Sequence, residues 1–277
     1  MTSTVGQAKG IDSVLAGART IVADSVNEER ASPDVERVVL VHGSMDRQAG
    51  FLKLARILST SFEVTLYDRR GYASSAAVPG PFGIGAHVRD LADVIGSKPA
   101  IVIGHSFGGT VALACATRHP EIVRGVVTYE NPMPWLEWWP SDTGAGQASR
   151  RDDDPELAAQ EFLVRFIGQR LWDRLPEATK RERRMEGRAL VDELASIHSA
   201  AAFELDAIAV PVSIGVGSLA RGYMRRGAEF LARRVDSRLM VLDGAHHNAH
   251  SSRPVEFADR LISPLVTRLS TGDWPPS

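Results

Sequence analysis

The sequence predicts an α/β fold, with a doubly wound and mostly parallel sheet interrupted by a helical insertion. From residue 35 onward, short apolar, β-branched runs alternate with helix-like stretches at the spacing of β-α-β units. The alternation stops near the middle of the chain and resumes some seventy residues later. We therefore expect a core domain made of residues 1–131 and 206–277, with residues 132–205 forming a helical cap.

The expected strands are short and rich in valine, isoleucine and leucine, as in strands that are covered on both faces. They fall at residues 38–41, 62–68, 100–103, 123–130, 210–217 and 238–244. Helical periodicity is found between them, at residues 51–58, 87–96, 110–117 and 224–235, and again from residue 255. The insertion has no convincing strand, and its tryptophan-rich and charged amphipathic stretches predict helices.

Composition excludes several classes of protein. A net charge of −2 over 277 residues gives no reason to expect binding to nucleic acid or to an anionic membrane. No run approaches the roughly eighteen apolar residues of a membrane span. The first thirty residues contain four acidic side chains and lack the apolar region of a signal peptide. The single cysteine, Cys115, lies in an expected buried helix and is interpreted as a packing residue. We expect a cytoplasmic protein, as a monomer or a homodimer.

A lone serine stands between two glycines, directly after the expected strand 100–103. The pentapeptide Gly104-His105-Ser106-Phe107-Gly108 has the pattern G-x-S-x-G, which places a nucleophilic serine on a tight turn between a strand and a helix. Both flanking positions of such a turn exclude a Cβ atom. The N-terminus of the following helix would favour negative charge at the site. The alternative is a glycine-rich turn with an idle serine.

Four motifs in order along the chain carry a resemblance to a known family. They are His42-Gly43, YDRRGYASS, GHSFGG and GAHHNAHSSRPVEF, and together they resemble the α/β-hydrolase superfamily from about residue 35 to the C-terminus. The resemblance implies that Ser106 is a nucleophile activated by a histidine, with no cofactor. It also implies an oxyanion hole formed by the backbone N–H of Phe107 and that of Ser44, with Met45 as the second choice for the latter.

The candidate bases follow the expected strand 238–244. The family's histidine stands about seven residues before a Pro-x-x-Phe sequence, which favours His247 because Pro254 begins PVEF. His246 is the second candidate. Together with His250 these residues also suggest a metal site, but no carboxylate or cysteine accompanies them in the sequence, and we expect no metal.

The acid is expected at an unusual place. The loop at residues 218–222, where the family usually carries it, reads SLARG and has no carboxylate, and Glu229 lies too far inside a helix. Glu130 ends the strand 123–130, 24 residues after Ser106, which resembles the position of the acid in some haloalkane dehalogenases. Glu130 is therefore the predicted acid. The alternatives are a strand-end glutamate in solvent and a site without an acid.

The remaining histidines carry no motif. His42 and His105 are expected to shape the loops around Ser106. His87, His119 and His198 lack companions in the sequence and are expected at the surface or in packing.

The stretch NPMPWLEWWP, directly after Glu130, suggests one wall of a substrate pocket. Met133, Trp135 and Trp138 are its candidate residues, together with Met45, although the same side chains could simply pack the cap on the sheet. The preferred function is a serine hydrolase acting on a small-molecule ester or related acyl compound with an apolar portion. The alternatives are a cofactor-free dioxygenase or C–C bond hydrolase on the same scaffold, and a non-catalytic ligand-binding protein.

Overall fold

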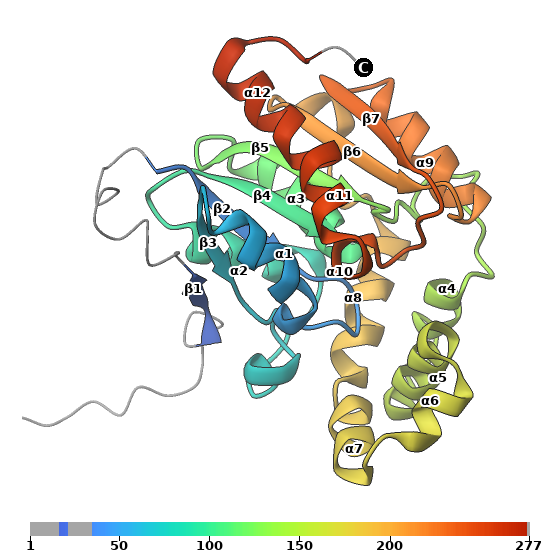
Figure 1. Ribbon diagram of the computed structural model, residues 1–277. Coiled ribbons are helices and arrows are strands. Elements are labelled where there is room, and N and C mark those ends of the chain that lie inside the picture. Colours follow the sequence, from blue (N-terminus) through green and yellow to red (C-terminus); the bar gives the residue numbers. More distant parts are fainter. Residues whose placement is uncertain (1–16, 22–34, 276–277) are drawn as a thin grey trace, which may run out of the picture.

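The computed structural model describes residues 17–21 and 35–275, in which a seven-stranded sheet lies between two layers of helices (Figure 1). The strand order is β1-β3-β2-β4-β5-β6-β7, and every neighbouring pair is parallel except β1 with β3. The predicted mostly parallel sheet is therefore confirmed. The strands are β1 (Arg19–Ile21), β2 (Arg37–Val41), β3 (Glu63–Leu66), β4 (Ala100–His105), β5 (Val123–Tyr129), β6 (Val212–Gly217) and β7 (Ser237–Leu242).

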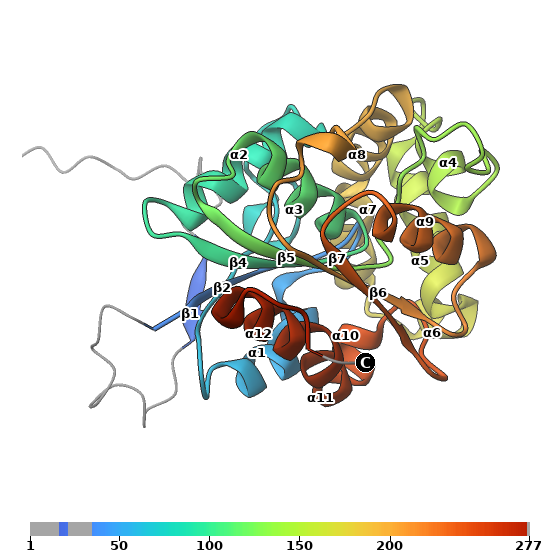
Figure 2. The ribbon, with the colours of Figure 1, turned by 90° about the horizontal axis from the view of Figure 1, so that it is seen from above.

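Helices cover both faces of the sheet, as Figure 2 shows from above. One face carries α2 (Ile84–Ile95), α3 (Phe107–Arg118) and α9 (Gly222–Ala232). The other carries α1 (Leu52–Leu58), α10 (Ala249–Ser252), α11 (Pro254–Phe257) and α12 (Ser263–Thr271), with a π-helical turn at Ala258–Ile262 between the last two. Short 3₁₀ turns lie at Gln48–Phe51, Ala73–Ser75 and Leu205–Ala207.

Alternation along the strands explains why both faces are covered. In β2, Val38 and Leu40 belong to the hydrophobic core beneath α1, α11 and α12, whereas Val39 and Val41 belong to the core beneath α2 and α3. Successive side chains of a strand point to opposite faces, so a strand that is apolar throughout requires helices on each side. In open α/β sheets of this kind, ligands bind beside the loops at the carboxyl ends of the strands, so the functional residues are expected there.

Five helices follow one another between β5 and β6, and we call α4–α8 the inserted helices. They are α4 (Gly144–Ala148), α5 (Pro155–Ile167), α6 (Gln169–Arg174), α7 (Glu177–Met185) and α8 (Gly187–Ser199). The described chain has no strand between β5 and β6. Helix α8 joins the core beside α2 through Leu190, Leu194 and Ile197, whereas α5, α6 and α7 extend beyond the sheet (Figure 1). Their role as a cap stays a prediction.

Two features at the start of the chain lie beyond the sequence-based expectations. Strand β1 pairs antiparallel with β3, and it was not predicted because three residues are too few to show a periodicity. Residues 1–16 and 22–34, on which the expectation of no signal peptide depends, lie outside the described residues. Within the described part, no helix is long and apolar enough to cross a membrane.

Cys115 lies in α3 among the residues of the core beneath α2, and it is a free cysteine. Burial raises the pKa of its thiol to about 12. The side chain is therefore an uncharged packing group at neutral pH, in agreement with its interpretation from the sequence.

Candidate active site

Ser106 lies on the turn between β4 and α3, in a strained conformation. Its φ of 53° and ψ of −127° are rarely adopted by a residue with a side chain. A Cβ atom at Gly104 would lie 2.4 Å from the carbonyl oxygen of Gly108, and one at Gly108 would lie 2.1 Å from that of Val41. Only glycine fits at these two positions, so the sequence motif is a steric requirement of this turn.

Glu130 follows β5 directly, and it too has a positive φ, of 48°. Its buried carboxylate accepts two hydrogen bonds. The His247 Nδ1–H donates to Oε2 at 2.7 Å, and the Gly217 N–H donates to Oε1 at 3.0 Å. Because Nδ1 carries the proton of this hydrogen bond, Nε2 of the neutral ring is left with a lone pair that can accept one.

The predicted acid therefore reaches the predicted base, and it does so across the strand that usually supplies the acid. Gly217 is the last residue of β6, and the loop 218–222 that follows it has no carboxylate. Glu229 lies inside α9 and makes no hydrogen bond or ion pair within the described chain. Of the two glutamates considered from the sequence, only Glu130 is placed to orient the imidazole.

The backbone around His247 is fixed on both sides. The Tyr129 hydroxyl donates to the carbonyl oxygen of His246 at 3.0 Å, and His105 Nε2–H donates to that of His247 at 2.8 Å. The His246 side chain is exposed, and among the described residues it has no hydrogen-bond partner. Both rings line the cavity, but only that of His247 is hydrogen-bonded to Glu130.

The residues predicted for the oxyanion hole lie beside Ser106. Phe107 is the first residue of α3, so its N–H has no acceptor within the helix. Ser44 and Met45 line the same cavity as Ser106, and within the described chain the N–H of Ser44 donates to no acceptor. Two backbone donors without partners on either side of a serine are what an oxyanion hole requires.

Comparison with known proteins identifies the family of this chain. A family model described as the alpha/beta hydrolase family matches residues 38–260. The chain belongs to this family. Curated relatives include a pimeloyl-[acyl-carrier protein] methyl ester esterase of Chromobacterium violaceum, 31% identical over 132 residues, which are 47% of this chain and 51% of that protein. An esterase of the same name from Neisseria meningitidis serogroup B is 36% identical over 100 residues, which are 36% of this chain and 38% of that protein.

The chain spans about half the length, or less, of these curated relatives. Solved structures extend the likeness over nearly the whole chain. An enol-lactonase from Burkholderia xenovorans LB400 superposes with a TM-score of 0.67 at 22% identity, covering 90% of this chain and 95% of that one. A thermophilic esterase from Thermogutta terrifontis gives a TM-score of 0.69 at 19% identity, covering 92% and 93%. At these identities the structures support the fold alone.

The cavity of this α/β hydrolase has a volume of about 540 Å³ and contains both Ser106 and His247. Its polar lining includes the loops that carry Ser44 and His247. Its apolar lining comes from α5 of the inserted helices, through Phe162, Leu163, Phe166 and Ile167. In the sequence these four residues show helical spacing only, which does not reveal what they face.

The pocket wall predicted from the sequence is only partly found in the structure. Met45 lines the cavity, but Met133, Trp135 and Trp138 are not among its lining residues. They pack between the start of the insertion and the core instead. Trp135 contacts the Phe203 ring at 5.2 Å, Trp138 lies 6.0 Å from Phe230, and Met133 is 1% exposed. The alternative stated from the sequence, that these side chains simply pack the insertion on the core, therefore applies to them. After β5 the chain passes over helix α9, and its aromatic side chains cover apolar surface there.

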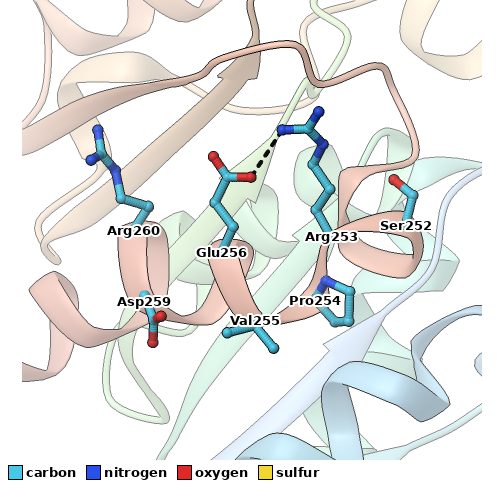
Figure 3. Close-up of a pocket in the computed structure, with 7 residues that line it drawn as sticks. All are labelled: Ser252, Arg253, Pro254, Val255, Glu256, Asp259 and Arg260. Atoms are coloured by element: carbon cyan, nitrogen blue, oxygen red, sulfur yellow. Dashed lines mark hydrogen bonds and ion pairs between the residues drawn. The ribbon is translucent and has the colours of Figure 1, made fainter.

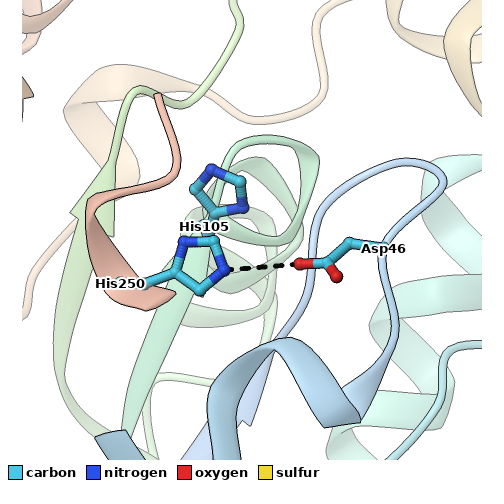
Figure 4. Close-up of side chains that lie close together, drawn as sticks. All are labelled: Asp46, His105 and His250. Carbon is cyan, nitrogen blue, oxygen red and sulfur yellow. Dashed lines mark ion pairs between the residues drawn. The ribbon is translucent and has the colours of Figure 1, made fainter. Parts of the chain in front are cut away.

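Three potential metal ligands meet beside the cavity, as Figure 4 shows: Asp46, His105 and His250. Their ligand atoms lie within 4.8 Å of one another, against a spacing of about 3.4 Å around a tetrahedral zinc ion with bonds near 2.1 Å. His250 Nε2 already faces Asp46 Oδ2 at 3.4 Å, and the His105 ring stacks on His250 with centroids 4.0 Å apart. We interpret the group as a partly buried pair of Asp46 and His250 that supports the loop carrying His247.

The pKa directions in this group fit that interpretation. Burial acts to raise the pKa of Asp46, but the hydrogen bond and charge of His250 outweigh it and lower the pKa. Burial, followed by the charges of His250 and His247, lowers the pKa of His105 well below its usual value. His105 is therefore a neutral hydrogen-bond donor to the backbone. The metal set considered from the sequence is not assembled, since His247 faces Glu130 and His250 faces Asp46.

A second hollow of this hydrolase, of about 580 Å³, lies open over α10 and α11. Figure 3 shows its largely charged lining, in which Arg253 Nη1 donates to Glu256 Oε2 at 3.1 Å. None of the predicted site residues lines it.

Proposed function

We propose that this protein is a serine hydrolase that cleaves a carboxylic ester or a related acyl compound with an apolar portion, through a Ser106-His247-Glu130 triad. The observation that carries the proposal is the 2.7 Å hydrogen bond between Glu130 and His247, in a cavity that also contains a strained serine. A nucleophile, an oriented base and two free backbone donors are the parts needed for acyl transfer.

In the proposed reaction, Ser106 Oγ attacks the carbonyl carbon while His247 Nε2 takes its proton. Glu130 stabilises the imidazolium, and the N–H groups of Ser44 and Phe107 donate to the oxyanion. His247 then gives the proton to the leaving alcohol, which departs and leaves an acyl-enzyme. Water attacks this ester with the same assistance from His247, which releases the acid and restores Ser106.

The cavity supports an acyl substrate that is partly apolar. Its apolar lining, from α5, would hold the carbon chain or ring, and its polar lining would hold the reacting carbonyl. Relatives named as methyl ester esterases and an enol-lactonase of the same fold are consistent with cleavage at an ester or lactone carbonyl. The reaction as written needs no cofactor, and the partner is a small molecule.

The proposal is tested with 4-nitrophenyl esters of increasing acyl length and with a fluorophosphonate probe. We expect hydrolysis with a burst of nitrophenol, because an acyl-enzyme accumulates when deacylation is slow, and stoichiometric labelling. A folded protein that neither hydrolyses nor labels would instead support the non-catalytic alternative. Labelling without hydrolysis of any ester in the panel, together with oxygen uptake on acidic carbon substrates, would support the dioxygenase. The same labelling together with C–C cleavage would support the C–C bond hydrolase.

Glu130→Gln is expected to lower kcat by about 10²- to 10⁴-fold with little change in KM, because the amide cannot stabilise the imidazolium or impose the same tautomer. Steady-state kinetics on the best ester of the panel measure both constants. Glu229→Gln is the matched control, since the same change on α9 should leave both constants as they are. A Glu130→Gln protein with nearly full kcat contradicts the assignment of the acid.

A further inference from the structure

We infer that Arg69 and Glu193 are positioning residues of the oxyanion hole. Glu193, from inserted helix α8, holds the Arg69 guanidinium against two backbone carbonyls, and this contact aims the N–H of Ser44 at the substrate. The inference deepens the proposed function and rests on it. Neither residue lines the cavity, so both act through the loop at residues 42–46.

The Arg69 guanidinium is buried and is bound to this loop from behind. Its Nε donates to the carbonyl oxygen of His42 at 2.8 Å, and its Nη2 donates to that of Gly43 at 2.9 Å. The backbone N–H of Arg69 also donates to the ring nitrogen Nε2 of His42, at 2.9 Å. Arg69 thus fixes the carbonyl groups of His42 and Gly43 and also the side chain of His42.

The His42 ring supplies a second donor to the carbonyl oxygen of Gly43. Since Nε2 accepts from the Arg69 N–H, Nδ1 carries the hydrogen and donates to the carbonyl oxygen of Gly43 at 2.8 Å. Burial, followed by the positive charge of Arg69, lowers the pKa of His42 to about 4, which keeps this tautomer neutral at pH 7. The N–H of Asp46 is a third, longer donor at 3.3 Å.

A carbonyl held by three donors determines where the next N–H points. In a trans peptide the carbonyl oxygen of Gly43 and the N–H of Ser44 lie in one plane and point in opposite directions. With the oxygen turned toward buried Arg69, the N–H is directed away from it, and Ser44 lines the cavity of Ser106. The loop touches the nucleophile, since a Cβ atom at Gly43 would lie 2.9 Å from that of Ser106.

Arg69 also contacts the residue that supplies the second donor. Its guanidinium lies over the Phe107 ring at 4.8 Å and over the Tyr72 ring at 4.9 Å. The ring of Phe107 is fully buried. The planar cation therefore packs between the two elements whose backbone N–H groups form the proposed oxyanion hole.

Glu193 sets the position of the guanidinium. Its fully buried carboxylate accepts from Arg69 Nη1 at 2.6 Å and from the Tyr72 hydroxyl at 2.7 Å, and His87 Nε2 lies 3.3 Å away. Burial alone would raise the pKa of Glu193, but the charge of Arg69 outweighs it and lowers the pKa to about 2. The pair is thus fully ionised, and it joins an inserted helix to the loop that binds the oxyanion.

Arg69→Lys is the first test, because an ammonium is a compact donor that cannot reach both carbonyls and Glu193 in the planar arrangement of a guanidinium. We expect kcat to fall by about 10- to 100-fold, less than the loss of a whole oxyanion donor, with KM changed less than about threefold. The rate of fluorophosphonate labelling should fall by a similar factor. Arg70→Lys is the matched control, since Arg70 pairs with Asp90 at 2.5 Å and not with the loop.

A boronic acid inhibitor separates positioning from a purely structural effect. Its tetrahedral adduct uses the oxyanion hole, whereas an unreactive ester analogue, such as the corresponding ether, does not. Arg69→Lys should weaken binding of the boronate by about the factor lost in kcat and leave binding of the ether unchanged. Circular dichroism and thermal unfolding verify that each variant is folded.

Glu193→Gln is the second variant, and it keeps every donor of Arg69 while removing the charge that holds it. We expect a smaller loss of about 3- to 10-fold in kcat and in boronate affinity, and this variant carries the test if Arg69→Lys does not fold. Boronate affinity and kcat within twofold of the unmodified protein, in a folded variant, overturn the inference alone. An unmodified protein that neither labels nor hydrolyses overturns the proposed function, and the inference with it.

Discussion

Ser106→Ala is expected to abolish fluorophosphonate labelling and to lower ester hydrolysis by about 10³- to 10⁶-fold, the range over which triad serines act. The expected loss is large because Ser106 Oγ is the atom that forms the acyl-enzyme in the proposed reaction, and the base, the acid and the backbone donors only assist its attack. Mass spectrometry of the labelled protein locates the adduct, and single-turnover kinetics measure the remaining rate.

The control for this experiment lies in the same cavity. Ser251 also lines it, but its hydroxyl donates to the carbonyl oxygen of Asn248 at 3.1 Å, and the residue stands on a helix. Ser251→Ala should therefore label at the rate of the unmodified protein. An adduct on any serine other than Ser106 would refute the assignment of the nucleophile.

His247→Ala should lower kcat by at least about 10³-fold, whereas His246→Ala should change it less than about threefold. Only the His247 ring is hydrogen-bonded to Glu130, while His246 has an exposed ring and contributes its backbone carbonyl to Tyr129. An alanine at position 246 keeps that carbonyl. Kinetics of the two single variants, with folding verified by circular dichroism, measure the difference.

Fluorophosphonate labelling of the same two variants gives an independent measurement. Labelling requires the base but no leaving alcohol, so the His247→Ala rate should fall and the His246→Ala rate should not. Equal losses in both variants would mean that the substitutions disturb the loop at residues 246–247 as a whole. The assignment of His247 as the base, and of Glu130 as its partner, would then be contradicted.

The order of the strands and helices and the turn that carries Ser106 could be predicted, because both can be recognised in short stretches of the sequence. The pattern around Ser106 occupies five consecutive residues and can be recognised without the structure, although the clash that excludes a Cβ atom at Gly108 is with Val41 of β2. The runs at residues 38–41 and 100–103 are apolar throughout. Glu130 was predicted from its place at the end of a strand, from the absence of a carboxylate at residues 218–222, and from the resemblance to relatives whose acid stands at the earlier strand.

The cavity wall and the positioning pair could not be predicted, because they depend on how distant segments pack. Phe166 belongs to a helix whose apolar stripe would fit any buried surface. Arg69 and Glu193 are 124 residues apart. The sequence places Arg69 in the motif YDRRGYASS, where an arginine is expected to form a local turn network, and it gives no sign of a contact with Glu193. The tryptophans after Glu130 were placed in the pocket from their composition, which does not distinguish a ligand surface from packing against α9.

The proposed position of the acid, directly after β5, has a consequence for how this hydrolase could change over evolutionary time. When the acid stands after β6, the following loop is under selection for catalysis. Here the N–H of Gly217 donates to the carboxylate, while Leu219 is 55% exposed. Apart from the neighbouring residues of its own helix, no described atom lies within 4 Å of where a Cβ at Gly222 would be. Ser218 is bound to the segment that precedes His247, since its hydroxyl donates to Asp243 Oδ1 at 3.2 Å and accepts from the Gly244 N–H at 2.7 Å. Residues 219–222 carry no member of the proposed triad, so their side chains could vary and supply new binding specificities beside it.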